Sequence, residues 1–275
     1  MPRRTPRESG TYVRIISHIF GNRYVEGDAE VSFPRQDIPD AADALGLDRP
    51  ANYGDVIYTF RYRGSMPNAI DAKAPAGKQW IIRGDGRGRY KFCAVSETVV
   101  IPSPTLVVTK VPDATPEIIR ANALGDEQAV LALVRYNRLI DTFLGLTAYS
   151  LQNHLRTTVP SMGQVEVDEI YLAVDTHGVQ YVLPVQAKGG NDVIGLTQIE
   201  QDVEVCKNKF PDLVGRPIAA QFMGSVIALF ELAVQNEELV VVREAHYELV
   251  QYDDITPEDR ELFRIQAQLP PVDSS

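Results

Sequence analysis

Alternating apolar and polar positions mark residues 163–190 as two strands folded back on each other. β-Branched and aromatic residues recur through 165–174 and again through 179–185, a pattern typical of paired strands. The intervening Asp175–Gly178 predicts a tight turn, with Gly178 in the left-handed position that closes it. In this register Asp168 faces Gln186. The side chains expected on one face of the hairpin are Glu166, Asp168, Gln186 and Lys188.

The segments around this hairpin predict a mixed sheet flanked by helices, which is an α/β fold. We expect helices over 126–143, 148–158 and 196–209, and another beginning at Thr256. Strands are expected over 217–223, 226–234 and 239–249. A segment with four prolines, 101–116, predicts an extended linker and therefore a domain boundary.

The first hundred residues predict a smaller α+β domain. Its expected elements are a helix over 12–20, an extended piece near 27–36, helices over 37–47 and 52–63, and a hairpin over 78–95. Asp37 is the expected N-cap of the second helix. The domain organisation is therefore 1–100, a linker over 101–116, and 117–275.

Composition indicates an ordinary globular chain, with 44% hydrophobic and 23% charged residues. No run of eighteen apolar residues and no signal-like N-terminus is present, so we expect a cytoplasmic protein. Cys93 and Cys206 are isolated, which argues against a disulfide scaffold or a zinc site. The four histidines are scattered and predict no cluster.

The polar residues at the open end of the hairpin have the chemistry of a Mg²⁺ site. Mg²⁺ prefers oxygen ligands and usually takes one or two carboxylates while keeping several waters. Asp168 offers a carboxylate, Gln186 a carboxamide oxygen, and Ala187 a backbone carbonyl. Lys188 beside them would position an attacking water or stabilise charge on a phosphate. The alternative is a solvated hairpin face, where acidic residues and lysines are common.

These residues resemble the core motif of the PD-(D/E)XK, or restriction-endonuclease-like, nuclease superfamily. Its pattern is an acidic residue in one strand and Glu/Asp-x-Lys in the next antiparallel strand. Here Asp168 takes the first position and Gln186-Ala187-Lys188 the second, so a glutamine replaces the acidic residue. The resemblance covers residues 163–222. It implies a restriction-endonuclease-like fold and a Mg²⁺-dependent endodeoxyribonuclease, with Asp168, Gln186 and Lys188 as catalytic residues.

In this superfamily a helix before the hairpin often contributes a further acidic residue to the site. Glu127 and Asp141 are the candidates, although either is more often a cap or a surface charge. Glu166 is a local alternative on the hairpin itself. Gln198 is a possible contact from the following helix, but a solvated face comprising Gln198, Gln201 and Asp202 is the favoured interpretation there.

The N-terminal domain resembles a winged-helix DNA-binding domain, because two short helices precede a basic hairpin. In that resemblance the helix 52–63 approaches the major groove and the hairpin 83–91 is the wing. The candidate DNA contacts are Arg61, Arg63, Arg83, Arg87, Arg89 and Lys91. The charge distribution is consistent with DNA binding by this domain, because its net charge is positive. Residues 1–100 hold 15 Lys and Arg against 12 Asp and Glu, whereas the remainder holds 12 against 25. The alternative is a glycine-rich surface hairpin with solvated arginines.

Taken together, the two resemblances imply a restriction endonuclease acting on double-stranded DNA. Cleavage of both strands would require two sites, so we expect a homodimer. A second hypothesis is a DNA-binding regulator that has kept the nuclease shape without its activity, because Gln186 removes a charge from the metal site. A third is a nuclease for branched or modified DNA.

Overall fold

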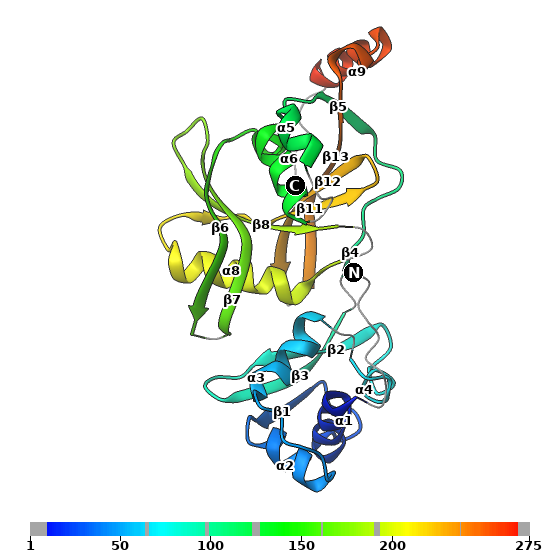
Figure 1. Ribbon diagram of the computed structural model, residues 1–275, viewed down its shortest axis with the longest axis vertical. Helices are drawn as coiled ribbons and strands as arrows, with labels where there is room; N and C mark the ends of the chain where they lie inside the picture. The colour runs from blue at the N-terminus through cyan, green and yellow to red at the C-terminus, as the bar shows by residue number, and fades with distance from the viewer. Residues whose placement is uncertain are drawn as a thin grey trace.

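The computed structural model describes residues 10–63, 66–96, 99–122, 127–160, 162–189, 193–236 and 238–268. It is a mixed α/β structure in which an N-terminal unit and a larger C-terminal unit lie side by side along the longest axis of the molecule (Figure 1). Within the described residues, no helix combines the length and apolar character needed to cross a membrane.

The N-terminal unit is a three-stranded antiparallel sheet covered by short helices. Its elements are α1 (Thr11–Arg23), β1 (Glu30–Pro34), α2 (Asp37–Ala44), α3 (Tyr53–Tyr58), a π-helical turn η1 (Thr59–Arg63), α4 (Asn68–Asp71), β2 (Lys78–Gly84) and β3 (Arg89–Ser96). The strand order is β1-β3-β2. One apolar core joins helices to sheet, with Ile16, Ile38, Val56, Trp80 and Phe92 among its buried members. Burial of this apolar face, rather than propensity alone, stabilises such short helices.

The C-terminal unit is organised around a curled mixed sheet of eight strands. Its path is β5-β13-β12-β11-β8-β7-β6, and β10 pairs with β8 beside it. The strands are β5 (Val108–Pro112), β6 (Thr147–Val159), β7 (Gly163–Val174), β8 (Gln180–Lys188), β10 (Val214–Gly215), β11 (Ile218–Met223), β12 (Val226–Gln235) and β13 (Glu238–Val250). β6, β7 and β8 form an antiparallel meander, and β11 then pairs with β8 in parallel.

Helices cover both faces of this sheet. On one face α6 (Glu127–Tyr136) and α7 (Leu139–Leu144) share a core with alternate residues of β7, β8 and β11. On the other face α8 (Leu196–Lys209) packs on the remaining residues of the same strands. Because α8 connects β8 to the parallel β11, it is the crossover helix of the unit. The other helices are α5 (Glu117–Asn122), the 3₁₀ turn η2 (Tyr252–Asp254) and α9 (Pro257–Gln268).

The two units are in contact through α8 and the β2–β3 hairpin. Leu196, the first residue of α8, packs against Cys93 and Val95 of β3. Arg83 of β2 forms an ion pair with Glu200 of α8 in which both side chains are largely buried. In addition β4 (Val99–Val100) pairs with β9 (Ile194–Gly195), immediately before α8. The N-terminal unit therefore packs directly on the crossover helix.

Two sequence predictions for the C-terminal unit are wrong. Residues 148–158, predicted as a helix, belong to β6, which pairs with β7 along its length. Its apolar residues recur at helical intervals because a register shift between Ser150 and Gln152 interrupts the two-residue alternation. The segment 101–116, predicted as a linker, contributes β5 to the edge of the sheet.

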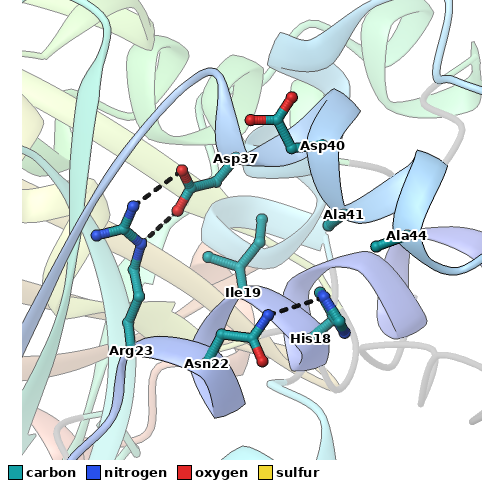
Figure 2. Close-up of a pocket in the computed structure, with 8 residues that line it drawn as sticks. All are labelled: His18, Ile19, Asn22, Arg23, Asp37, Asp40, Ala41 and Ala44. Carbon is teal, nitrogen blue, oxygen red and sulfur yellow. Dashed lines mark hydrogen bonds and ion pairs between the residues drawn. The ribbon is translucent and has the colours of Figure 1, made fainter.

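Two helix termini also differ from the sequence prediction. The expected helix 126–143 is broken into α6 and α7, because Arg138 adopts a left-handed φ of 50°. Asp37 is not the N-cap of α2: Gln36 takes that position and Asp37 is the first helical residue. The Asp37 carboxylate instead pairs with Arg23 of α1, so it joins the two helices rather than capping one (Figure 2).

Candidate functional site

The β7–β8 hairpin places the candidate residues. Its observed register pairs Val174 with Gln180 and Leu172 with Val182, as the sequence predicts. Gly178 has a φ of 82°, the left-handed conformation that the turn requires. Asp175 accepts hydrogen bonds from the backbone N–H groups of His177 and Val179, which fixes the turn and therefore the register.

Asp168 lies where the two strands stop pairing. The last paired residues are Glu169 and Val185, and beyond them the Ala187 N–H donates to Asp168 Oδ2 at 2.9 Å. A side-chain carboxylate thus occupies the place of a backbone acceptor between β7 and β8. The contact holds Asp168 against the Gln186-Ala187-Lys188 motif and occupies only one of its two carboxylate oxygens.

Gln186 is directed toward α8. It is 2% exposed, and its Nε2 donates to Asp202 Oδ1 at 2.8 Å. Because the amide nitrogen is committed to Asp202, the carbonyl oxygen of Gln186 must point in another direction. Asp202 itself has no exposed surface, and its second oxygen, Oδ2, has no hydrogen-bond partner within the described residues.

Lys188 reaches the N-terminus of α6. Its Nζ lies 3.1 Å from Oε1 of Glu127, the first residue of that helix. The lysine is mostly buried, whereas Glu127 is partly exposed. The helix preceding the hairpin thus contributes a carboxylate beside the motif lysine.

Electrostatic interactions connect these groups at the end of β8. Burial raises the pKa of Asp168, and the Ala187 N–H and the Lys188 ammonium only partly offset that effect. Complete burial holds the pKa of Asp202 well above its ordinary value, despite the hydrogen bond from Gln186, and the charge of Asp168 raises it further. Asp168 and Lys188 are therefore near enough to Asp202 to influence its pKa, and Lys188 also influences that of Asp168.

The donor atoms suit a hard divalent cation that keeps several waters. No group of three or more His, Cys, Asp or Glu side chains with metal-binding geometry occurs among the residues the structure describes. The available side-chain oxygens are those of the Asp168 carboxylate and the Gln186 carboxamide. Asp202, which accepts from Gln186, has a second oxygen, Oδ2, without a hydrogen-bond partner within the described residues. Mg²⁺ commonly accepts so few protein ligands. The third predicted ligand is the carbonyl of Ala187, a residue paired with Ala220 of the neighbouring strand.

The other predicted supporting residues lie apart from this cluster or at its edge. Glu166 forms ion pairs with two side chains of β6, His154 at 3.4 Å and Arg156 at 3.1 Å. Asp141 accepts from the Ala148 N–H and pairs with Arg138, which gives it a local structural role. Gln198 is half-buried on α8, one turn before Asp202.

Two buried acidic residues were not singled out as site residues by the sequence. The predicted solvated face of α8 is wrong, because Gln201 and Asp202 are both buried. The signal in the sequence was the i, i+4 spacing of Gln198 and Asp202, which places both side chains on the same side of α8. Glu169, adjacent to Asp168, is also fully buried and accepts from Arg135 Nε at 2.9 Å and from Ser150. Because neighbouring side chains of a strand point to opposite faces, and because Glu169 contacts α6, Glu169 lies on the face of the sheet opposite to Asp168.

The predicted DNA contacts are in different environments. Arg61 is buried, Arg83 pairs with Glu200, and Lys91 pairs with Glu30 at 2.6 Å. The side chain of Arg63 lies outside the described part of the chain. Arg87 in the turn between β2 and β3 and Arg89, the first residue of β3, are both exposed, and Arg89 is 3.8 Å from Asp85. The tip of the hairpin therefore presents Arg87 and Arg89 to solvent, whereas Arg83 and Lys91, farther along the strands, form ion pairs within the chain.

A groove of about 420 Å³ lies between α1 and α2 in the N-terminal unit (Figure 2). Ile19, Ala41 and Ala44 contribute its apolar surface, and the charged side chains at its margin include Asp40 and the Arg23–Asp37 pair. None of the residues of the β7–β8 cluster lines it. It is separate from the candidate site.

Comparisons with known proteins do not indicate a function for this chain, so any functional assignment depends on its own residues. No family model matches this chain, and a search of curated proteins finds no match.

Proposed function

We propose that this chain is a Mg²⁺-dependent endodeoxyribonuclease of the PD-(D/E)XK type, with restriction of foreign DNA as its biological role. The observation that carries the proposal is the Ala187 N–H bond to Asp168, which brings the acidic residue of one strand against the Gln-x-Lys motif of the next. The arrangement of elements also supports it. A carboxylate-bearing helix precedes the meander, and a crossover helix leads from β8 to a parallel strand.

Asp168 and Gln186 would hold the cation, with the Ala187 carbonyl as a further donor. A bound Mg²⁺ would withdraw charge from the scissile phosphate and lower the pKa of the attacking water. Lys188 would position that water for in-line attack and stabilise charge on the phosphate as the bond to the leaving oxygen breaks. Its contact with Glu127 fixes the position of the ammonium group.

The N-terminal unit would bind the duplex as a winged-helix domain. Its order of helices and strands, with α2 and α3 followed by the β2–β3 hairpin, supports that resemblance. Arg87 and Arg89 at the exposed turn are then the phosphate or base contacts of the wing. Arg83, by contrast, would connect the DNA-binding unit to the catalytic unit through Glu200. Cleavage of both strands by one site per chain would make the active species a homodimer.

A DNA-binding regulator with an inactive nuclease domain is the second candidate. The metal-ligand set favours it, since Asp168 is the one carboxylate that the motif itself supplies and Gln186 is neutral. A nuclease for branched or modified DNA would share the same site and differ in its substrate.

A plasmid assay tests the proposal. Supercoiled DNA incubated with the protein and Mg²⁺ or Mn²⁺ should be nicked or linearised, and EDTA should abolish the reaction. Asp168→Asn should reduce the rate by roughly 10²- to 10⁴-fold. A protein that retards DNA in a gel but leaves it intact with either metal would be the regulator instead. Branched and methylated substrates in the same assay separate the third candidate.

A further inference from the structure

The glutamine at position 186 raises the question of what fixes its orientation. A carboxylate presents oxygen in either orientation, whereas a carboxamide presents oxygen on one side and a donor N–H₂ on the other. A glutamine can serve as a cation ligand only if its amide is held with the oxygen toward the cation. The structure gives Gln186 such a restraint: its Nε2 lies 2.8 Å from Asp202 Oδ1.

We propose that Asp202 is a positioning residue for the nuclease reaction, holding the Gln186 carboxamide so that its oxygen is presented to the metal. This inference rests on the proposed function. The Gln186 Nε2 donates to Asp202 Oδ1, so the amide oxygen of Gln186 is turned away from Asp202.

The surroundings of Asp202 fit this role better than a role in stability alone. Asp202 is fully buried and Gln186 nearly so, so water cannot take the place of either partner. The second oxygen of Asp202 has no hydrogen-bond partner within the described residues, so the bond from Gln186 is the one side-chain hydrogen bond that this carboxylate makes there. Asp202 lies on α8, the helix whose other contacts include the N-terminal unit.

Gln186 and Asp202 therefore form a matched pair of one donor and one acceptor. A glutamate at 186 would place two carboxylates within hydrogen-bond distance in a buried site, where one of them would have to take a proton. Exchanging both residues, Gln186→Glu with Asp202→Asn, keeps one acid and one amide and reverses the direction of the bond. The double variant presents carboxylate oxygen at position 186.

The test compares the wild type, Asp202→Asn, Gln186→Glu and the double variant. Asp202→Asn leaves two amides that can pair in either sense, so cleavage should fall about 10-fold, the size expected for one hydrogen bond, and should need more Mg²⁺. The cleavage rate of Gln186→Glu should fall by a similar factor. The double variant should recover most of the wild-type rate. Glu204→Gln, which alters an acidic residue of the same helix paired with Lys207, is the matched control and should cut normally.

A second measurement does not depend on cleavage. The side-chain amide signal of Gln186 in a ¹⁵N spectrum, assigned by its loss in Gln186→Glu, should exchange slowly with water and shift in Asp202→Asn. The proposal is overturned if Asp202→Asn leaves both this signal and the Mg²⁺ dependence unchanged, or if the double variant is no faster than the slower single variant. If the wild type itself cuts no DNA, the proposed function fails, and the amide signal still reports whether Asp202 holds Gln186.

Discussion

Asp168 and Glu169 are adjacent carboxylates for which the structure predicts opposite effects of neutralisation. Asp168 contacts the motif of β8, whereas Glu169 points to α6. We compare Asp168→Asn with Glu169→Gln, two changes that each remove one charge and preserve side-chain shape. The first should remove activity and spare stability; the second should lower stability and spare activity.

The cost of Glu169→Gln follows from its contacts. Glu169 is 0% exposed and receives hydrogen bonds from Arg135 and Ser150. Removing one partner of a buried ion pair typically costs about 3–5 kcal/mol. The cost here should be less, roughly 2–3 kcal/mol, because Arg135 is 35% exposed and keeps a contact with Asn153. Asp168→Asn keeps an oxygen for the Ala187 N–H, so it should change stability by less than about 1 kcal/mol.

Urea unfolding followed by far-UV circular dichroism gives the stability of each variant. Tryptophan fluorescence is unsuitable for this purpose, since the one tryptophan, Trp80, lies in the N-terminal unit. Plasmid cleavage per folded molecule gives the activity: Asp168→Asn should lose roughly 10²- to 10⁴-fold and Glu169→Gln less than about threefold. The roles assigned to the two carboxylates are contradicted if Glu169→Gln cuts the plasmid more slowly than Asp168→Asn at equal folded concentration, or if Asp168→Asn is the less stable protein.

Three further predictions concern other parts of the chain. Gly215→Ala should destabilise the protein by roughly 1–3 kcal/mol in urea unfolding, because a Cβ there would lie 2.8 Å from Cys206 Cβ; an unchanged midpoint would contradict this packing. Burial alone would raise the pKa of Asp175, but hydrogen bonds from its turn and from a tyrosine hydroxyl lower it overall. Its contribution to stability is therefore present above the unfolded pKa of about 3.9 and lost as pH falls through the lower folded value. Thermal midpoints of the wild type and Asp175→Asn should thus converge below about pH 4, and a gap that widens on acidification would show the sign to be wrong. Replacing both Arg87 and Arg89 with glutamine should weaken DNA binding and reduce the salt slope by about 2 if each contacts a phosphate; binding with an unchanged slope would remove the turn from the interface.

The sequence predicted the elements whose patterns are local and uninterrupted. The helix 196–209 and the turn at Gly178 occur as expected, because periodicity, turn chemistry and burial agree there. The helix beginning after Thr256 also occurs, since Thr256 and Asp259 exchange hydrogen bonds across its first turn. Such elements can be predicted without knowing which other segments they pack against.

The failures arise where a distant partner decides the structure. β6 has apolar spacing suited to a helix, but pairing with β7 and a register shift make it a strand. Asp202 would be a plausible surface residue on an isolated helix, yet packing on the sheet buries it against Gln186. Arg83 and Lys91 fit a basic wing by sequence, whereas acidic partners far along the chain pair with both. Burial and pairing of charges depend on tertiary contacts that a linear pattern does not contain.

The most direct test of the account is single-turnover cleavage of supercoiled plasmid at saturating Mg²⁺ by the wild type and by Lys188→Met. Methionine keeps much of the length of the lysine and removes its ammonium, so folding should be preserved while water positioning and charge stabilisation are lost. We expect the wild type to nick the plasmid and the variant to be slower by at least about 10²-fold. Equal rates for the two proteins, or intact plasmid with the wild type, would contradict the claim that Asp168, Gln186 and Lys188 form a nuclease site.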